Sequence, residues 1–534
     1  MSESKNMKHQ DLNLQFVDNF TSALDADPIT DNTKRQVHEA AYSWVSPTPS
    51  ALPSILAVSP DVAALIGLDY NLKTDNFFRD VFTGNTSFAS ANPYAMCYGG
   101  HQFGHWAGQL GDGRAINIAE VAHNDLRWVL QLKGAGPTPY SRTADGLAVL
   151  RSSIREYLCS EAMHFLGVPS TRALSIGLTG DEVLRDVMYD GHPAYEKGAV
   201  VCRVAQSFIR FGSFEIFASR KDISNLKKLA DYTITTHYPE IKAEGKQKYV
   251  AFFQAVAKRT LEMVLQWQRV GFVHGVMNTD NMSILGQTID YGPYGWLEGY
   301  DHNWTPNTTD RAHRRYRYGY QPRICLWNLM QLANALYPLI EENEPLESIL
   351  ENYQGQYPVE ELKMIRAKMG FLQAYDEDKH IIEQWKKVIH LTEVDFTIFF
   401  RELSGLDAED LDDSKGLPTQ LLDAFYNSEH YNGDIKIQWD DWWSGYINRL
   451  SKETDPIQSR QKVMKLVNPK YVLRNYLAQL CIDKADNQDY SMLHELAVML
   501  RSPYTDNPKY DKWYAKRPEW ARNKVGCSML SCSS

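Results

Sequence analysis

Short apolar runs separated by turn residues dominate the chain up to about residue 220, and apolar residues at helical spacing dominate after it. Runs rich in β-branched and aromatic residues predict strands, and these runs cover residues 127–134, 171–179, 181–189, 198–204 and 207–211. Apolar residues three and four apart predict helices, and this spacing covers residues 146–166, 223–237, 247–269 and 324–337. Two further helices are expected, over residues 32–44 and from Pro60, and Pro338 is expected to stop the helix before it.

These elements predict an α+β fold in four regions that dock tightly, since no internal repeat or long Ser/Gly linker separates them. In chain order we expect a helical N-terminal extension (1–90), a β-rich unit (91–220), a helical unit with the candidate loops (221–340) and a helical region with a cysteine-containing tail (341–534). In the last region Trp439, Trp442 and Trp443 are expected to anchor a core.

Composition excludes several classes of function. A formal net charge of −10 argues against a general nucleic-acid binder, because affinity for polyanions needs a basic surface. No apolar run approaches the roughly 20 residues of a membrane span, and residues 1–27 lack the apolar core of a secretory signal. Seven cysteines without a C-x-x-C motif do not describe a disulfide framework or a zinc ribbon. We therefore expect a cytoplasmic protein that binds neither membranes nor nucleic acid.

The clearest candidate chemistry lies in HGVMNTDN (274–281) and DYG (290–292). Amide and carboxylate oxygens suit Mg²⁺, and kinases use an Asn and the Asp of Asp-Phe-Gly to hold it against nucleotide phosphates. Counted from His274 as the His of the kinase motif His-Arg-Asp-x-x-x-x-Asn, the Asn falls on Asn281. Val276 then stands at the position of the catalytic Asp and cannot accept a proton. The sequence predicts a kinase-like metal site, with Asp290 as its second ligand, that lacks the usual kinase base.

A glycine-dense stretch lies upstream, YGGHQFGHWAGQLGDGRA at residues 98–115. Glycines at this density let backbone N–H groups approach a ligand closely, as they do in phosphate-binding loops. A tight hairpin would explain the same glycines, but Arg114 adds a cation and an apolar run follows it. The nucleotide loop is the favoured interpretation.

Three further cations are candidates for phosphate contacts. Lys133 ends the predicted strand after the glycine-dense stretch, where a kinase-like lysine meets phosphate oxygens. Glu156, on the next predicted helix, is the candidate partner of Lys133, although it could instead pair at the surface with Arg155. Arg203 and Arg210 stand seven apart among apolar residues, where a guanidinium needs a carboxylate or a ligand.

Taken together, these motifs resemble the selenoprotein O family. The likeness covers roughly residues 40–534 and rests on long matches: YGGHQFG, QLGDGRA, LKGAGPTPYSR, HGxxNTDNM and DYGPYG. It implies a protein-kinase-like bilobal fold with a β-rich N-lobe, a helical C-lobe and an additional helical C-terminal region. It also implies a protein adenylyltransferase, an enzyme that transfers AMP from ATP to Ser, Thr or Tyr hydroxyls of proteins and releases pyrophosphate.

The resemblance assigns roles to residues at matching positions. Asp280 becomes the proton acceptor, Asn281 a ligand of Mg²⁺ (or Mn²⁺), and Asp290 a ligand of metal and nucleotide together. The remaining ATP contacts would come from Gly111, Gly113, Arg114, Lys133, Asp145, Gly146, Arg203 and Arg210. Glu156 would hold Lys133 in an ion pair. An ATP-binding pseudokinase scaffold and a conventional kinase remain alternatives, and Val276 argues against the kinase.

The sequence departs from the family in two places. The resemblance implies a redox-active pair between a C-terminal cysteine and a cysteine after the DYG motif. Residues 299–321 contain no cysteine, and Pro306 stands near the expected place. Cys532 would then pair with Cys527 or stay free, and both thiols are expected in a flexible, unburied terminus. The second departure is Arg314, which precedes Arg-Tyr where the family usually has glycine.

Overall fold

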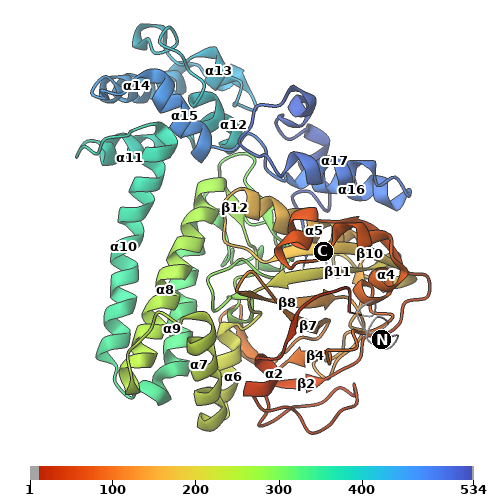
Figure 1. Cartoon of the computed structure of the whole chain (residues 1–534). Coiled ribbons are helices and arrows are strands. Elements are labelled where there is room, and N and C mark those ends of the chain that lie inside the picture. Colours follow the sequence, from red (N-terminus) through yellow and green to blue (C-terminus); the bar gives the residue numbers. More distant parts are fainter. Residues whose placement is uncertain (1–10, 532–534) are drawn as a thin grey trace.

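The computed structural model describes residues 11–531 and has a mixed α/β architecture built on one large antiparallel sheet (Figure 1). Within the described residues this sheet has nine strands in the order β2-β4-β7-β8-β11-β10-β3, with β1 paired to β7 and β9 paired to β11. Its strands are β1 (Phe16–Val17), β2 (Tyr42–Trp44), β3 (Ser54–Val58), β4 (Tyr94–Met96), β7 (Ala115–His123), β8 (Leu126–Lys133), β9 (Ala148–Val149), β10 (Arg172–Arg185) and β11 (Ala194–Ala205). Two small hairpins complete the β-structure: β5 (Gly99–Gln102) with β6 (His105–Gln109), and β12 (Phe272–Val273) with β13 (Gly295–Trp296).

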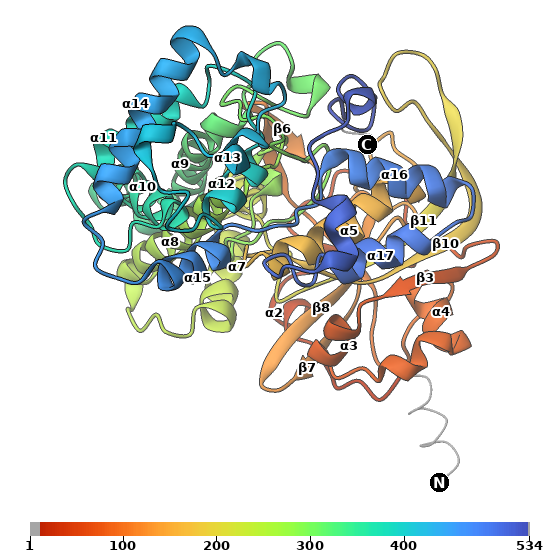
Figure 2. The same cartoon turned by 90° about the horizontal axis from the view of Figure 1, so that it is seen from above.

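Helices surround the sheet and form the rest of the molecule (Figures 1 and 2). Those before residue 341 are α2 (Phe20–Ala23), α3 (Pro60–Leu65), α4 (Asn76–Phe82), α5 (Leu150–Phe165), α6 (Phe211–Ser219), α7 (Ile223–His237), α8 (Gly245–Val270) and α9 (Gln321–Ile340). Those after it are α10 (Glu344–Met369), α11 (Asp378–Val388), α12 (Phe396–Leu403), α13 (Thr419–Leu422), α14 (Gly433–Leu450), α15 (Ile457–Val467), α16 (Asn475–Asp486) and α17 (Ser491–Met499).

The register of the central strands places the candidate cations on one face of the sheet. Lys133 lies opposite Val201, and Gln131 lies opposite Arg203, in the β8–β11 pair. Directly opposed residues share a face, as do residues two apart along a strand. Lys133, Gln131 and Arg203 therefore project together, toward the side on which α5 packs.

Several expected elements differ from the structure. Residues 32–44 contain no helix: their end forms β2, which pairs with β4. Residues 207–211 form no strand but lead into α6. The two strands expected over residues 171–189 are one strand, β10, which ends at Arg185 and continues through a register shift between Leu178 and Glu182. Pro338 lies inside α9 and does not stop it. The helix continues for two more residues, Leu339 and Ile340, and both are buried.

The first and last of the four expected regions are also corrected. Within residues 11–90 the chain adds β1, β2 and β3 to the main sheet, so this part is not a separate helical extension. Residues 341–531 do not pack as one unit. Trp439, Trp442 and Trp443 anchor a second hydrophobic core, as predicted, whereas α16 and α17 return to the first core and lie against α5 (Figure 2).

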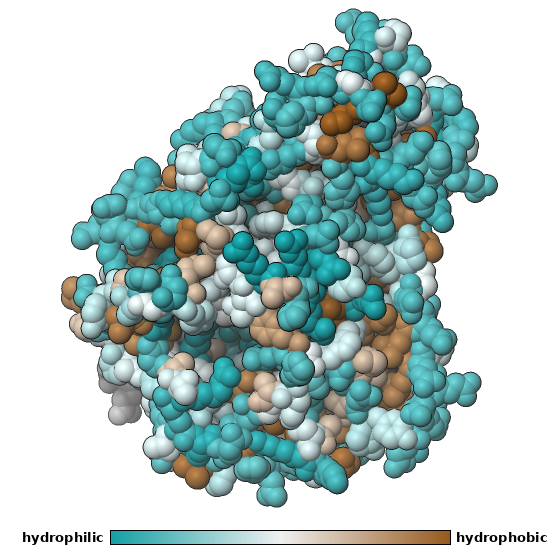
Figure 3. All heavy atoms as spheres, turned by 180° about the vertical axis from the view of Figure 1, so that it is seen from behind, coloured by the Kyte–Doolittle hydropathy of each residue, from teal (hydrophilic) through white to brown (hydrophobic). Residues whose placement is uncertain are grey.

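The helices of residues 11–531 include none that is long and apolar enough to span a membrane. Viewed from behind, polar side chains cover most of the surface, and apolar ones appear in small separate groups (Figure 3). The polar groups that bear on function lie where the sheet meets α5, α6 and the loops around residues 274–292.

Candidate active site

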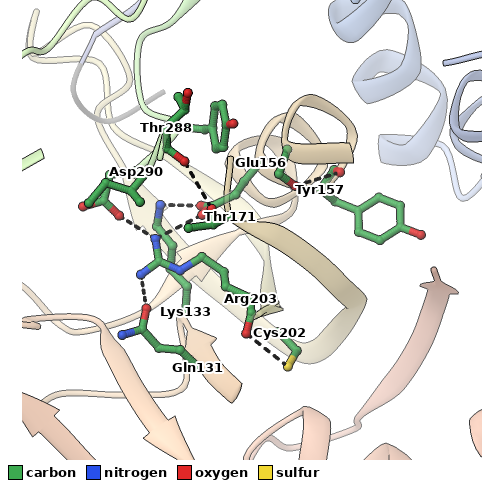
Figure 4. A network of polar contacts seen from close by, with 12 residues as sticks. Gln131, Lys133, Glu156, Tyr157, Thr171, Cys202, Arg203, Thr288 and Asp290 are labelled. Carbon is green, nitrogen blue, oxygen red and sulfur yellow. Dashed lines mark hydrogen bonds and ion pairs between the residues drawn. The ribbon is translucent and has the colours of Figure 1, made fainter. Parts of the chain in front are cut away.

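Lys133 and Glu156 form a buried ion pair between the sheet and α5 (Figure 4). Lys133 ends β8 with 8% of its surface exposed, and Glu156 on α5 is 2% exposed. Burial lowers the pKa of Lys133, and the Glu156 carboxylate opposes that effect. Arg155 turns away from this pair and donates to the Tyr294 carbonyl oxygen at 2.7 Å. The surface pair of Glu156 with Arg155 is therefore absent.

Two buried arginines converge on Asp290. Arg203 Nη1 donates to Asp290 Oδ1 and, at 3.2 Å, to Glu156 Oε1, while Arg210 Nη1 donates to Asp290 Oδ2. Burial alone would raise the pKa of Asp290, but the guanidinium groups of Arg210 and Arg203 hold it well below its usual range. Asp290 adopts a positive φ of 58°, a conformation uncommon for a side chain with a Cβ. Asp290 therefore contacts two cations from a strained backbone conformation.

Asp280 lies in the short helix η2 (Thr279–Asn281), beside Asp290 and 8% exposed. Its Oδ2 accepts a hydrogen bond from Gln102 Nε2 at 3.1 Å, whereas its Oδ1 has no partner among the described residues. Burial raises the pKa of Asp280 to about 6, partly offset by the Gln102 hydrogen bond and the Arg210 charge. Arg210 also donates to the Asp280 backbone carbonyl at 2.7 Å. The carboxylate is consequently held in place with one oxygen free.

The first half of the glycine-dense stretch forms the β5–β6 hairpin, which packs over the 278–280 loop. The His101 amide donates to Thr279 Oγ1 at 2.7 Å, and the Phe103 amide donates to Asn278 Oδ1 at 3.2 Å. A Cβ on Gly100 would lie 2.9 Å from Asp280 Oδ1, so only glycine allows this approach. For this half, the hairpin alternative is correct: it covers the candidate acid.

The second half, residues 110–114, is a turn that leads into β7. A Cβ on Gly113 would lie 2.8 Å from the Tyr140 carbonyl oxygen, so close packing against residues 138–141 already requires glycine there, and Gly111 packs against the Tyr140 ring. Arg114 lies close enough to Lys133 to affect its pKa.

The structure brings Asp145 and Gly146 less directly to the cluster. Asp145 pairs with Arg185 at 2.7 Å, and its side chain is 44% exposed. Its Oδ1 accepts the Leu147 amide at 3.0 Å, so it caps a turn and does not begin α5, which starts at Leu150. Gly146 has a φ of +77° and sits against Gly136.

Four residues that contact the predicted ones were not predicted from the sequence: Tyr98, Gln102, Asp112 and Gln131. Their residue types are common in strands and hairpins, so the sequence did not single them out. Gln131 accepts from Arg203 Nη2, and the Tyr98 ring lies 4.6 Å from the Arg210 guanidinium carbon. Asp112 is 1% exposed and lies 3.7 Å from Arg210. The one available signal was strand alternation, which places Gln131 on the same face as Lys133.

The end of the described chain reaches the same loops. The Leu530 amide donates to the Pro306 carbonyl at 2.9 Å, and the Thr308 amide donates to the Leu530 carbonyl at 2.7 Å. Asn307 then donates to the Gly275 carbonyl at 3.0 Å. Cys527 is 1% exposed, so the expectation of an unburied thiol there is wrong, because this part of the tail packs into the first core. Cys532 lies outside the described residues.

The described residues offer oxygen ligands for a cation that arrives bound to a nucleotide, but they do not form a metal site from protein ligands alone. Among residues 11–531 no three His, Cys, Asp or Glu side chains are grouped to hold a metal. Asn281 Nδ2 donates to the Val276 carbonyl at 2.9 Å, which leaves the amide oxygen available. Mg²⁺ bound with a nucleotide needs only one or two protein oxygens besides phosphates and water. An amide oxygen and the Asp290 carboxylate fit that requirement.

Buried lysine and arginine side chains clustered around a carboxylate are typical of enzymes that handle nucleotide phosphates. The site accordingly has the character of a nucleotide-dependent transferase. Residues 31–501 match the family model described as protein adenylyltransferase SelO. The chain belongs to this family, and its enzyme class is that of the nucleotidyltransferases.

Similar proteins extend over the same length. The protein nucleotidyltransferase YdiU of Flavobacterium johnsoniae is 56% identical over 522 residues, covering 98% of this chain and 100% of the relative. Those of Aromatoleum aromaticum and Rhodopirellula baltica are 52% and 51% identical, each over 98% of this chain and over 100% and 99% of the relative. The similarity therefore includes both hydrophobic cores and the candidate site.

Proposed function

We propose that this chain is a protein adenylyltransferase with a kinase-like bilobal fold. The large sheet and α5 correspond to the N-lobe, and α6 to α9 with the 274–292 loops correspond to the helical C-lobe. The expected boundaries near residues 91, 220 and 340 stand as part of this proposal, with the qualification that β1 to β3 belong to the N-lobe sheet.

The observation that carries the proposal is the set of buried cations with unpartnered N–H groups around Asp290. Lys133, Arg203 and Arg210 meet three carboxylates, Glu156, Asp290 and Asp112, and the Nε atoms of both arginines lack partners among the described residues. A bound triphosphate would bring phosphate oxygens to these cations. When pyrophosphate leaves, charge develops on its oxygens, and preorganised cations stabilise that charge.

In the reaction, the hydroxyl oxygen of a substrate Ser, Thr or Tyr attacks the α-phosphorus of ATP. The bond from that oxygen to the α-phosphorus forms, the bond from the α-phosphorus to the bridging α–β oxygen breaks, and pyrophosphate departs with the electron pair. Asp280 Oδ1, buried and unpartnered, accepts the hydroxyl proton. Positioning and electrostatics dominate phosphoryl transfer, so a carboxylate that orients the hydroxyl is sufficient. Asp280 thereby replaces the base that Val276 cannot provide.

Other candidate residues complete the nucleotide site. Asn281 and Asp290 would hold Mg²⁺ or Mn²⁺, which neutralises phosphate charge when bound. Gly111, Gly113 and Arg114 line the phosphates from the turn before β7. Asp145 and Gly146 border the nucleotide from the turn before α5, with Asp145 released from Arg185 if it contacts ATP directly.

ATP labelled at the α- or the γ-phosphate distinguishes the possible functions. The protein is incubated with divalent metal and candidate acceptor proteins, and the proteins are then separated on a gel. Label from α-ATP alone is the expected result. Label from γ-ATP alone would establish a kinase, and retention of bound ATP without label in any protein would establish a pseudokinase scaffold.

A further inference from the structure

Residues 311–340 contain five arginines and no Asp or Glu, in a chain whose formal net charge is −10. The arginines gather at the start of this interval, at positions 311, 314, 315, 317 and 323, which we call the arginine segment. Arg311, Arg314 and Arg323 are exposed, and the other two are partly exposed. A basic surface concentrated in one short segment of an acidic protein requires a specific explanation.

Nearby carboxylates do not neutralise the arginine segment. Among the described residues, none of its guanidinium groups forms an ion pair. Asp310, the adjacent acid, instead accepts the backbone amides of Arg315 at 2.9 Å and Tyr316 at 2.7 Å. Arg314 holds a φ of +47°, where glycine is more readily accommodated. The turn therefore keeps an exposed guanidinium at a position that the backbone disfavours.

Aromatic rings pack against the planar faces of Arg315 and Arg317 and fix their orientation. Arg315 lies 4.6 Å from the Trp327 ring centroid, and its Nε and Nη2 are buried without a partner among the described residues. Arg317 lies 3.5 Å from the Tyr320 ring centroid. A guanidinium stacked on a ring is preorganised to bind carboxylates with its edge.

The arginine segment lies next to the candidate proton acceptor. The Arg315 guanidinium contacts the hairpin at Gly104, where a Cβ would be 3.4 Å from Arg315 Cζ. Tyr316 OH accepts the Phe103 amide at 2.9 Å and donates to Asn278 Oδ1 at 2.6 Å. Gln102, one residue before Phe103, donates to Asp280. The hairpin thus contacts both the arginine segment and Asp280.

We propose that the arginine segment binds an acidic stretch of the protein substrate beside the hydroxyl to be modified. This inference rests on the proposed function, because it assigns the substrate class of the same site. Attraction between complementary charges steers association, and this attraction weakens at high salt. The other polyanion to consider is nucleic acid, and the acidic remainder of the surface disfavours it.

Two peptides test the inference. Both carry one serine in a Gly-rich sequence, flanked in one by four glutamates and in the other by four lysines. Binding is measured by fluorescence anisotropy of labelled peptide, and transfer is measured separately with α-labelled ATP. The variant is Arg311→Glu with Arg314→Glu. Its control is Lys258→Glu with Lys379→Glu, which changes the net charge equally at side chains that are 76% and 72% exposed on α8 and α11.

The wild type is expected to prefer the acidic peptide, and the preference should fall as salt increases. The arginine variant should bind it about tenfold more weakly, since two ion pairs are lost and the new charges repel. KM for the peptide should rise while kcat and KM for ATP stay constant. The control variant should match the wild type in every measurement, and both should keep the wild-type melting temperature.

Equal binding of the two peptides, or an unchanged affinity in the arginine variant, would overturn the inference. So would a single-stranded RNA oligonucleotide that binds as tightly as the acidic peptide and loses affinity in the same variant. Failure of the proposed function looks different: the acidic peptide binds selectively, yet no AMP is transferred to any acceptor. Binding and transfer together therefore separate the two conclusions.

Discussion

Two buried clusters of charge in this molecule have opposite characters. Around Asp395, the Arg474 guanidinium makes hydrogen bonds of 2.7 and 2.9 Å, the Ile398 amide adds a third at 3.0 Å, and both charged side chains are at most 2% exposed. Around Asp290, the carboxylate is 22% exposed, and polar atoms of Arg203 and Arg210 lack partners among the described residues.

The difference separates a structural ion pair from a binding site. A buried pair that satisfies its own hydrogen bonds holds helices together and leaves nothing for a ligand. A cluster with spare donors and some access to solvent is destabilising unless a ligand completes it. We therefore propose that the same residue types serve the fold near Asp395 and bind a ligand near Asp290, and substitutions can tell these uses apart.

The largest expected effect is on catalysis at the open cluster. Asp290→Ala removes the carboxylate that we assign to metal and nucleotide, and transfer of label from α-ATP should fall by about 10³-fold or more. The melting temperature should change less than in a variant that leaves a buried arginine unpaired, because Arg203 keeps Glu156 at 3.2 Å and Arg210 keeps Asp112 at 3.7 Å. Activity close to that of the wild type would refute the assignment of Asp290.

At the closed cluster the effect should be on stability. Asp395→Ala leaves Arg474 buried without a partner, which costs about 3–5 kcal/mol and lowers the melting temperature by several degrees. The matched control is Asp506→Ala, whose carboxylate pairs with Arg401 at 2.8 Å but is 55% exposed, and which should cost at most about 1 kcal/mol. Equal losses in the two variants would contradict the distinction between the clusters.

Gln102→Ala tests a residue that positions the open cluster. Its amide donates to Asp280 Oδ2, and a hydrogen bond to a charged group contributes roughly 1.5 kcal/mol, or about tenfold in rate. We expect kcat to fall by about that factor while KM for ATP and the melting temperature stay constant. His105→Ala, at the exposed end of the same hairpin, is the control. A loss of stability without a change in kcat would indicate a purely structural role for Gln102.

The clustering of the candidate residues was easier to predict from the sequence than the edges of the fold. Lys133, Glu156, Arg203 and Asp290 were found because ionisable residues among apolar neighbours must meet partners or ligands. Helices α7 and α8 were found because their apolar stripes extend over several turns. In both cases the signal lies in a local pattern.

What could not be predicted depends on contacts distant in sequence. Residues 32–44 were assigned to a helix, but pairing with β4 turns their end into β2, and propensity yields to such tertiary contacts. The position of the β5–β6 hairpin over Asp280, 178 residues away for Gln102, has no local signature. Cys527 appeared to belong to a free tail because nothing near it in sequence reveals the core that buries it.

The smallest expected effect concerns Glu298, the incompletely paired carboxylate near the closed cluster. Its Oε2 lies 3.4 Å from Arg517 Nη1, its Oε1 has no partner among the described residues, and it borders a cavity of about 480 Å³. Burial raises the pKa of Glu298 to about 7, above its usual 4.5, and the Arg474 and Arg517 charges reduce that rise.

The folded state therefore binds more protons than the unfolded state between pH 4.5 and 7, so Glu298 makes stability fall as pH rises through this window. Glu298→Gln removes the titrating group and should melt roughly 1 °C higher than the wild type at pH 8, a gain of about 1 kcal/mol. At pH 5 the two proteins should melt together, because Glu298 is then mostly protonated in the folded state. Glu393→Gln, at a 35% exposed carboxylate on the same cavity, controls for loss of charge near Arg517. A variant that melts below the wild type at pH 8 would show that Glu298 is a satisfied partner of Arg517, and that the region around Asp395 is closed throughout.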